Sequence, residues 1–427
     1  MKRLLSPRYQ APLLKLCLVL GAMWLLLSLL NAGKNLIFLR SYSTLNYTDE
    51  CLEKDCSCSA ILEGDMEAVA QAKLLTIVTE FRKKIHIPDE YYIKATNDCM
   101  KFKLKRKYFT FPLSKEEQDF PIAYSIVVHH KMQNFERLLR AIYAPQNFYC
   151  IHVDQKSPPS FWAAVSAVAS CFPNVFLASR SESVVYASWS RVQADINCME
   201  DLYRASSKWK YFINLCGQDF PLKTNLEMVR VLRTLNGNNN LESERMPPNK
   251  LWRVNKVHRV VDGRIQPTTL AKGLPPFNVT IFSGNAYIVA SRGFVRSVLE
   301  DERVMAVMEW AKDTFSPDEI LWASIQRMAG VPGSKWPHVK YDMSDLNAVA
   351  RLVKWRSLEG PQGSSASVYP ICRGTHVRDI CVYGAGDLQW LIQQHHFFGN
   401  KFDIDIDAVS IYCLEKYLRN KALAESL

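Results

Sequence analysis

The hydrophobic pattern begins with one long apolar run, residues 16–33, that carries no charged side chain. About 18 residues at 1.5 Å each span roughly 27 Å, which is close to the hydrocarbon thickness of a bilayer. Cations flank the run, namely Lys2, Arg3, Arg8 and Lys15 before it and Lys34 after it. The pattern predicts a single signal-anchor transmembrane helix with a cytosolic amino terminus, which places the rest of the chain in an oxidising lumen or outside the cell. A cleaved signal peptide ending near Ala32 and Gly33 is the alternative.

The remaining pattern divides the chain into a stem and one large body. Residues 1–15 form the predicted cytosolic tail, residues 34–60 lack periodicity and are predicted to be a lumenal stem, and residues 61–427 form a body without an internal Pro/Gly/Ser-rich boundary. The body begins with a predicted helix over residues 64–84. Its expected apolar face consists of Met66, Val69, Leu74, Ile77, Val78 and Phe81.

From residue 122 onward, short apolar runs alternate with amphipathic stretches. Strands are predicted at 122–128, 149–154, 175–178 and 211–216, and helices at 135–143, 157–171 and 188–204. Such alternation indicates the α/β class with a mostly parallel sheet, in which ligands bind at the carboxyl ends of the strands. Beyond it we expect a hairpin around Asp262 and Gly263, a buried strand at 280–290, and helices within 292–328, 387–395 and 408–422.

The cysteines fit an oxidising compartment. Eleven of the 12 cysteines follow Cys17, and no cysteine pair has the spacing of a zinc knuckle, so disulfides are the expected state. The odd number of lumenal cysteines leaves at least one thiol unpaired or bonded between chains. Asn46 and Asn278 each begin a glycosylation sequon.

The formal net charge of +11 indicates either an anionic partner or a solvated basic surface. Nucleic acid is excluded as a partner because a lumenal protein does not meet it, and because the cations are spread along the chain rather than clustered. An anionic small molecule is the more plausible ligand.

Asp154 follows a predicted strand, where its carboxylate could accept hydrogen bonds from a nucleotide. The alternative is an Asp that only caps the turn into Ser157. The strand supplies a single Asp instead of the Asp-x-Asp that holds a metal, and the later triplet Asp403, Asp405 and Asp407 is interpreted as acids at the start of the last helix. No metal site is therefore predicted.

Without a metal, a leaving diphosphate needs fixed cations. Arg378 lies between Cys372 and Cys381, which are close enough in sequence for a local disulfide loop, and Lys401 follows the turn-like Gly399 and Asn400. A guanidinium binds phosphate in a planar, bidentate manner and an ammonium acts as a point charge. Two ordinary surface cations are the alternative.

Glu319 is the candidate for acid–base chemistry, because a carboxylate can accept the proton of an attacking hydroxyl. The local pattern also fits a capping box, with Ser316 as N-cap, Pro317 at the first helical position and Glu319 three residues after the cap. By pattern alone the capping interpretation is favoured.

Four further residues could contact sugars. Their types suit hydroxyl recognition and ring stacking, although such residues are more often solvated charges or core aromatics. They are Glu242, Lys250, Arg253 and Trp355.

Five segments together resemble the core 2 β-1,6-N-acetylglucosaminyltransferases (glycosyltransferase family 14), which branch mucin-type O-glycans. The segments are residues 121–130 (PIAYSIVVHH), 144–147 (APQN), 184–195 (VVYASWSRVQAD), 315–322 (FSPDEILW) and 383–387 (YGAGD). The resemblance extends from about Cys58 to the carboxyl terminus. It implies a type II Golgi membrane enzyme with a GT-A-like nucleotide-sugar-binding domain. Such an enzyme transfers GlcNAc from UDP-GlcNAc, with inversion and without a cofactor or divalent metal, to the 6-hydroxyl of GalNAc in galactosyl-β1,3-GalNAc on Ser or Thr of O-glycosylated glycoproteins.

The resemblance also implies roles for individual residues. Glu319 matches the catalytic base and replaces the capping preference, while Arg378 and Lys401 match the basic pair that stands in for a metal. The implied nucleotide contacts are Val127, Asp154 and Tyr186, and the implied acceptor contacts are Glu242, Lys250, Arg253 and Trp355. Ser357 departs from the Tyr of the core 2-restricted members, which leaves open whether core 4 and I branches are also made.

The same matching implies four disulfides and one free thiol. The pairs are Cys58 with Cys413, Cys99 with Cys171, Cys150 with Cys198, and Cys372 with Cys381, with Cys216 left free. Cys51 and Cys56 in the stem can bond to each other or link two chains as a homodimer. Two alternatives stay open: a relative acting on linear poly-N-acetyllactosamine, and an inactive lumenal glycan-binding protein.

Overall fold

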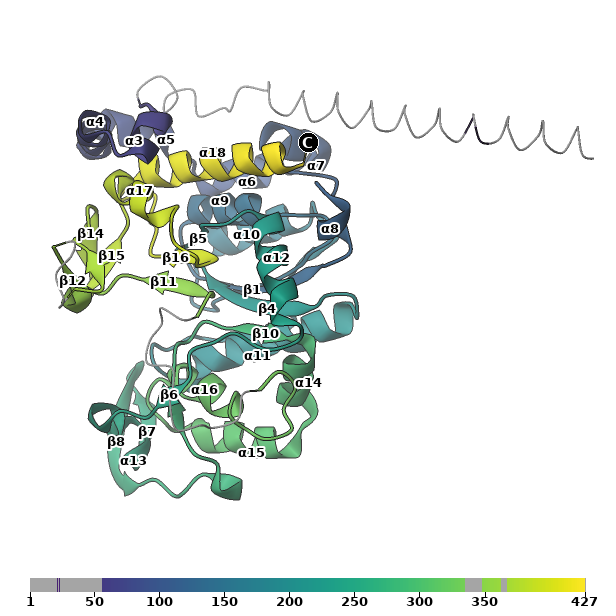
Figure 1. The fold of residues 1–427 in the computed structure, drawn as a ribbon, viewed down its shortest axis with the longest axis vertical. Coiled ribbons are helices and arrows are strands. Elements are labelled where there is room, and N and C mark those ends of the chain that lie inside the picture. Colours follow the sequence, from purple (N-terminus) through teal and green to yellow (C-terminus); the bar gives the residue numbers. More distant parts are fainter. Residues whose placement is uncertain (1–20, 22, 24–55, 335–347, 362–366, 427) are drawn as a thin grey trace, which may run out of the picture. The chain divides into compact units, whose positions relative to one another are not determined.

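A computed structural model describes Gly21, Met23 and residues 56–334, 348–361 and 367–426 (Figure 1). The chain divides into two units, residues 1–48 and 49–427, and nearly all described residues belong to the second. Most of the predicted membrane segment, the stem up to residue 55, Asn46 and Cys51 lie outside the described residues. Over the part that is described, no helix is both long and apolar enough to cross a membrane.

A five-stranded sheet forms the centre of the body, with the strand order β10-β4-β1-β2-β3. β1 (Ile122–Val128), β2 (Phe148–Val153), β3 (Val175–Leu177) and β4 (Tyr211–Cys216) run parallel, and β10 (Val289–Ser291) pairs antiparallel with β4. This confirms the predicted mostly parallel sheet and fits a GT-A-like fold.

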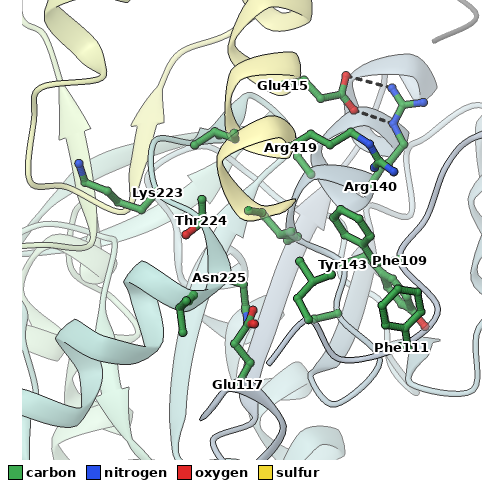
Figure 2. A pocket seen from close by; sticks show the side chains of 17 residues that line it. Phe109, Phe111, Glu117, Arg140, Tyr143, Lys223, Thr224, Asn225, Glu415 and Arg419 are labelled. Atoms are coloured by element: carbon green, nitrogen blue, oxygen red, sulfur yellow. Dashed lines mark hydrogen bonds and ion pairs between the residues drawn. The ribbon is translucent and has the colours of Figure 1, made fainter. Parts of the chain in front are cut away.

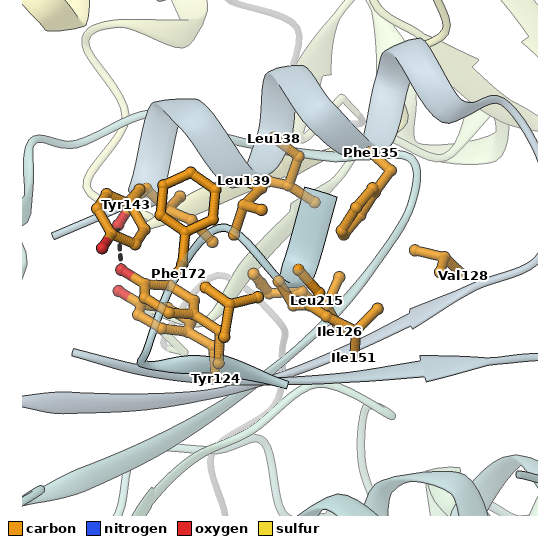
Figure 3. Close-up of a cluster of buried hydrophobic side chains, with 14 of the residues drawn as sticks. Tyr124, Ile126, Val128, Phe135, Leu138, Leu139, Tyr143, Ile151, Phe172 and Leu215 are labelled. Atoms are coloured by element: carbon orange, nitrogen blue, oxygen red, sulfur yellow. Dashed lines mark hydrogen bonds between the residues drawn. The ribbon is translucent and has the colours of Figure 1, made fainter. Parts of the chain in front are cut away.

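Helices cover both faces of this sheet. α9 (Met132–Ile142) and α10 (Pro159–Ala169) pack on one face, and α11 (Trp189–Ala205) and α14 (Arg292–Glu300) on the other. Because side chains alternate along a strand, Tyr124, Ile126 and Val128 point into the first core, where Figure 3 shows them below Phe135 and Leu139 of α9. Every residue of β1 is buried, which explains why this strand appears in the sequence as a continuous apolar run.

Smaller sheets are added around the central one. β11 (Arg351–Val353), β16 (Phe398–Asn400) and β5 (Asp219–Pro221) form a three-stranded sheet in the order β11-β16-β5. The two-stranded ones pair β6 (Glu244–Arg245) with β9 (Phe282–Ser283), β7 (Lys256–Val261) with β8 (Arg264–Ala271), β12 (Glu359–Gly360) with β13 (Tyr369–Pro370), and β14 (Thr375–Val377) with β15 (Ile380–Val382).

The remaining helices surround these sheets. They are α3 (Cys58–Glu63), α4 (Met66–Ile77), α5 (Thr79–Ile85), α6 (Asp89–Ala95), α7 (Cys99–Lys105), α8 (Lys115–Gln118), α12 (Asn225–Leu235), α13 (Trp252–Asn255), α15 (Glu302–Ala311), α16 (Leu321–Ile325), α17 (Leu388–Leu391) and α18 (Ala408–Glu425). Short 3-10 turns are η1 (Pro248–Lys250), η2 (Pro276–Asn278), η3 (Pro317–Glu319), η5 (Arg356–Leu358) and η6 (Ala385–Asp387). α3 begins within the last residues of the predicted stem.

Two predicted elements are wrong in detail. The single helix expected over 64–84 is two helices, because Val78 adopts extended backbone angles between α4 and α5. Of the expected apolar face, Phe81 is buried as predicted, but Met66, Leu74, Ile77 and Val78 are exposed. In α4 the buried residues are Ala72 and Thr76.

The strand expected over 280–290 is also divided, into β9 and β10, which belong to different sheets. The break falls at Gly284, where a Cβ atom would lie 2.3 Å from the carbonyl oxygen of Glu242. The chain passes too close to a neighbouring segment there for any larger residue.

Four disulfides are present among the residues that the structure describes. They are Cys58–Cys413, Cys99–Cys171, Cys150–Cys198 and Cys372–Cys381, the pairs that the resemblance implies. The first ties α3 to α18 across 355 positions of sequence, and the last closes a loop of nine positions around the β14–β15 hairpin.

Candidate active site

The carboxyl ends of β1, β2 and β4 form one edge of the central sheet, which we call the carboxyl edge. Val127 lies near the end of β1 between His152 and Cys216, and is nearly buried. Asp154 follows β2, and its backbone N–H donates to the carbonyl oxygen of Val128 at 2.9 Å. Its carboxylate accepts a hydrogen bond from the N–H of Lys156 at 2.8 Å, so Asp154 does cap the turn that follows β2, as the alternative interpretation predicts. The residue also lies at the carboxyl edge, because it directly follows β2.

The loop that follows β3, residues 178–188, connects three parts of the site. The carbonyl oxygen of Val184 accepts a hydrogen bond from Nζ of Lys156, and that of Ala187 accepts one from the N–H of Ser316 at 2.8 Å. Tyr186 is highly exposed, and its ring centre lies 5.7 Å from the guanidinium carbon of Arg378. The loop therefore brings the neighbourhoods of Asp154, Glu319 and Arg378 together.

Glu319 ends η3 and does not form the capping box that its local pattern favours. Ser316 has φ near +46°, outside the extended region of an N-cap, and in the described part of the chain its side chain makes no capping hydrogen bond. The carboxylate of Glu319 instead forms an ion pair with Arg253. The glutamate is 37% exposed, so its carboxylate is accessible to a ligand.

Arg253 is fixed by aromatic neighbours. Its guanidinium carbon lies 5.8 Å from the ring centres of both Trp252 and Phe315, within the range of cation–π attraction. The N–H of Phe315 also donates to the carbonyl oxygen of Arg253 at 3.1 Å. The arginine that pairs with Glu319 is therefore held by both its side chain and its backbone.

Two other predicted acceptor contacts gather beside Glu319. Lys250 donates from Nζ to Oγ of Ser283 at 3.1 Å, and the next residue, Gly284, donates its N–H to the carbonyl oxygen of Glu319 at 2.8 Å. Gly284 is also the close neighbour of Glu242. Glu242, Lys250 and Glu319 thus converge on the segment around Gly284.

Trp355 lies in a different position, beside the β14–β15 hairpin. It forms an isolated antiparallel bridge with Ile380 and is 39% exposed. Ser357 follows it in η5. The structure therefore associates Trp355 with the hairpin that carries Arg378 rather than with the Glu319 cluster.

Arg378 occupies the tip of that hairpin. Arg378 and Asp379 both have positive φ, 51° and 61°, as a two-residue type I′ turn requires. The Cys372–Cys381 disulfide closes the hairpin at its base. An exposed guanidinium is thus presented from a covalently closed loop.

Lys401 follows β16 and lies within electrostatic reach of Arg378. Burial lowers the pKa of Lys401 and Arg378 adds to this shift, whereas Cys216 and Asp219 oppose it. Two cations that repel each other in this way gain stability when an anion binds between them. The pair is suited to a diphosphate.

Cys216 ends β4 at the same carboxyl edge. Its Sγ accepts a hydrogen bond from Nδ2 of Asn400 at 3.3 Å and lies 3.8 Å from the hydroxyl of Tyr287. Burial, and secondarily Asp219, raises the pKa of this thiol to about 11. It lies outside the four disulfides, as the resemblance implies.

The Asp triplet near the carboxyl terminus has structural partners. Nζ of Lys131 pairs with Asp403 at 2.5 Å and with Asp405 at 2.8 Å. Asp407 is the N-cap of α18 and accepts the N–H of Ser410 at 2.8 Å, as the helix-start interpretation predicts.

Groups of metal-ligand type are few in the described ranges. His, Cys, Asp and Glu atoms gather in threes at two places, Cys56 with Cys58 and Cys413, and Glu359 with Cys372 and Cys381. Each place contains two cysteines that are already joined in a disulfide.

The sequence interpretation missed a buried polar network beneath the site. Arg191 and Asp195, four positions apart on α11, form an ion pair at 2.7 Å, and Asp195 also accepts hydrogen bonds from Ser125 and Asn214. Burial, with Glu319 adding, raises the pKa of Asp318 to about 6. The i, i+4 spacing of Arg191 and Asp195 was the available signal.

A cavity of about 50 Å³ lies elsewhere, between the carboxyl end of α9 and α18 (Figure 2). Phe109, Lys223 and Arg419 line it, together with the Arg140–Glu415 ion pair. Since α9 runs back from the carboxyl end of β1 to the start of β2, this cavity belongs to the opposite edge of the sheet. It is separate from the candidate site.

A mostly parallel sheet, with a carboxylate and two cations presented beyond its strand ends, fits a glycosyltransferase of the GT-A-like class. The chain belongs to the Core-2/I-Branching enzyme family, whose model matches residues 122–392.

Named relatives agree with this assignment. The chain is 55% identical over 379 residues to the Homo sapiens protein named beta-1,3-galactosyl-O-glycosyl-glycoprotein beta-1,6-N-acetylglucosaminyltransferase, covering 89% of this chain and 88% of the relative. It is 54% identical over 383 residues to the Bos taurus protein of the same name, with 90% and 89% covered. A second human relative, whose name adds the number 3, is 54% identical over 371 residues, with 87% and 84% covered.

Proposed function

We propose that this protein transfers GlcNAc from UDP-GlcNAc in β1,6 linkage to the GalNAc 6-hydroxyl of galactosyl-β1,3-GalNAc on Ser or Thr, with inversion and without a metal. The observation that carries the proposal is the ion pair between Glu319 and Arg253, which replaces the capping box and leaves the carboxylate accessible. The names of the relatives support the choice of donor sugar, linkage and acceptor.

In the proposed reaction, Glu319 accepts the proton of the acceptor hydroxyl as its oxygen bonds to the anomeric carbon of GlcNAc. The bond from that carbon to the diphosphate breaks at the opposite side, and both of its electrons leave with UDP. Arg253 orients the carboxylate. Arg378 and Lys401 offset the charge that develops on the diphosphate, which is the task a metal performs in other transferases.

Nucleotide recognition is assigned to the carboxyl edge. We place the uridine part against Val127, Asp154 and Tyr186, because the loop that carries Tyr186 reaches both Lys156 and Arg378. Acceptor recognition is assigned to Glu242, Lys250, Arg253 and Trp355.

The deciding experiment uses the full-length protein in detergent with UDP-GlcNAc and an aryl galactosyl-β1,3-GalNAc, in excess EDTA. The expected result is a trisaccharide with a β1,6 linkage, identified by NMR. A complete lack of product would refute the transferase proposal, and loss of product on adding EDTA would refute the metal-free mechanism.

Acceptor breadth is a separate part of the proposal. Ser357 lies beside Trp355, so the acceptor contacts near this hairpin differ from those of core 2-restricted enzymes. We propose that GlcNAc-β1,3-GalNAc and linear poly-N-acetyllactosamine are also used. Equal concentrations of the three acceptors in one assay test this, and product from the core 1 disaccharide alone would contradict it.

We further propose a Golgi enzyme of type II topology, anchored by residues 16–33, in which Cys51 and Cys56 either bond to each other or link two chains. The charge pattern around that segment and the four disulfides of the body support a lumenal location. Imaging of the full-length chain, and a non-reducing gel of the wild type against a Cys51→Ser, Cys56→Ser variant, test the two parts. Stable accumulation at the cell surface would refute the Golgi location. A dimeric wild-type band that the variant lacks would assign the two cysteines to a bond between chains, and a monomeric wild-type band would refute such a bond.

A further inference from the structure

Trp252 combines exposure with a fixed position. Its side chain is 49% exposed, which is unusual for an indole that has packing partners on its own domain. The ring centre lies 4.7 Å from that of Phe315 and 6.1 Å from that of His258, and the Arg253 guanidinium lies 5.8 Å from the indole. One part of the indole is therefore packed while the remainder faces solvent.

The partners of Trp252 are themselves anchored to the segment that leads to Glu319. His258 is buried and donates its N–H to the carbonyl oxygen of Asp313 at 2.8 Å. Phe315 donates its N–H to the carbonyl oxygen of Arg253. The indole is thus held by two connections to residues 313–315, one from His258 of β7 and one from Arg253 of α13. Little rotamer entropy therefore remains to be lost when a ligand covers it.

Trp252 is connected through Arg253 to Glu319, the proposed catalytic base. The guanidinium of Arg253 contacts the indole of Trp252 and also pairs with Glu319, so one side chain connects the indole to the proposed base. A hydroxyl that gives its proton to Glu319 belongs to a sugar ring lying against the carboxylate.

We propose that Trp252 is a stacking platform for a second pyranose ring of the acceptor glycan, the ring glycosidically linked to the one that reacts. The inference rests on the proposed function. A pyranose presents an apolar C–H face that suits an indole, and a hydroxyl at its rim finds a polar partner in the Arg253 guanidinium beside the indole. This charged neighbour favours a sugar over an apolar polypeptide side chain as the occupant.

The test compares a disaccharide acceptor with a monosaccharide acceptor. We measure kcat and KM of the full-length wild type and of Trp252→Ala with aryl galactosyl-β1,3-GalNAc and with aryl GalNAc, at saturating UDP-GlcNAc. For Trp252→Ala we expect an increase of about tenfold in KM for the disaccharide, with the donor KM and the monosaccharide KM within twofold of wild type. Because Arg253 loses one of its two ring contacts, kcat should fall by the same factor for both acceptors. Trp252→Phe, which keeps an aromatic face, should recover part of the affinity.

A neighbouring apolar residue supplies the matched control. Leu251 is 41% exposed and adjacent in sequence, so Leu251→Ala removes a similar exposed surface without the aromatic face. We expect it to leave the disaccharide KM unchanged. If Leu251→Ala raises that KM as much as Trp252→Ala does, the specific role of the indole is refuted.

Other outcomes overturn the platform in distinguishable ways. An unchanged disaccharide KM, or equal increases for both acceptors, refutes the second-ring subsite. A fall in kcat alone means that Trp252 acts only by holding Arg253. A loss confined to glycoprotein acceptors means that the indole contacts polypeptide.

A binding measurement separates this inference from the proposed function. Saturation-transfer NMR with the disaccharide requires no turnover, and we expect Trp252→Ala to weaken the signal of the non-reacting ring. If the wild type binds the disaccharide through both rings but forms no product, the proposed reaction fails and the platform stands. If the wild type does not bind it, both fail.

Discussion

The guanidinium of Arg253 forms an ion pair with the carboxylate of Glu319 across 66 positions of sequence. Arg253 is 16% exposed and Glu319 37% exposed, so the arginine is the more buried partner and the carboxylate the more accessible one. The side chain of Glu319 pairs with Arg253 instead of the backbone of Ser316, so it does not cap the start of a helix. The two roles proposed for Glu319 can therefore be separated by experiment.

Replacement of Glu319 by Gln is expected to lower kcat by about 10²–10⁴-fold, because an amide cannot accept the proton of the acceptor hydroxyl. The melting temperature should change little, since no capping hydrogen bond is lost. Glu302→Gln, an exposed position in α15, is the control and should keep wild-type turnover. Turnover of Glu319→Gln within twofold of wild type would exclude Glu319 as the base.

Tyr186 and Arg378 are expected to act together in binding the donor. Their cation–π contact, at 5.7 Å between exposed groups, should contribute about 0.5–1 kcal/mol of coupling. A double-mutant cycle with Tyr186→Ala and Arg378→Ala, measured on the KM for UDP-GlcNAc, gives this coupling directly. Tyr186→Phe retains the ring and should retain the coupling. Strict additivity of the two alanine substitutions would mean that the ring does not position the guanidinium.

Asp318 should make the stability of the fold depend on pH. Its pKa is raised from 3.8 to about 6, first by burial and then by Glu319, so the native state holds a proton that the unfolded state releases. Between about pH 4 and pH 6 this group therefore lowers stability as the pH rises. Asp318→Asn removes this pH dependence. The free energy of unfolding of the variant minus that of wild type should therefore rise by about 1–3 kcal/mol between pH 4 and pH 6 and stay constant above pH 6.

Urea unfolding at several pH values with the disulfides intact checks this expectation. Asp262→Asn, at the exposed turn between β7 and β8, serves as the control and should show a constant difference from wild type. A constant difference for Asp318→Asn as well would show that Asp318 is already ionised in the folded protein at pH 4.

The central sheet could be predicted from the sequence because its signal is local. Each residue of β1 is buried, so the strand is a continuous apolar run, and the flanking helices carry their own periodicity. The division of residues 280–290 into β9 and β10 could not be predicted from the sequence. The break between the two strands depends on how closely Gly284 approaches Glu242. Such an approach leaves no pattern in a single sequence.

The candidate site also has a part that could be predicted from the sequence and a part that could not. The sequence and its resemblance supplied Glu319, Arg378 and Lys401, but the local pattern favoured a cap at Ser316. The cap is prevented by the backbone of Ser316, whose N–H bonds to Ala187, 129 positions earlier in the chain. Long-range contacts of this kind decide between two uses of the same short motif, and local patterns do not contain them.

The last prediction concerns Glu136, which is fully buried on α9. It accepts hydrogen bonds from Nε of Arg106 and from the hydroxyl of Tyr108, both at 3.1 Å. Burial alone would raise the pKa of Glu136, but Arg106 and Arg140 lower it to about 2. Glu136→Gln leaves Arg106 buried without its counter-charge, and we expect a loss of about 3–5 kcal/mol in the free energy of unfolding at pH 7.

The pH dependence gives this prediction a second, independent readout. Since the pKa of Glu136 is lowered from 4.5 to about 2, its contribution is complete above pH 4.5 and is lost as the pH falls toward 2. The gap between wild type and Glu136→Gln should therefore be constant from pH 7 to pH 5 and narrow below. Asp119→Asn breaks an exposed pair with Lys115 and should cost less than about 1 kcal/mol. Equal losses from the two variants would mean that Glu136 is not the counter-ion that compensates the buried charge of Arg106.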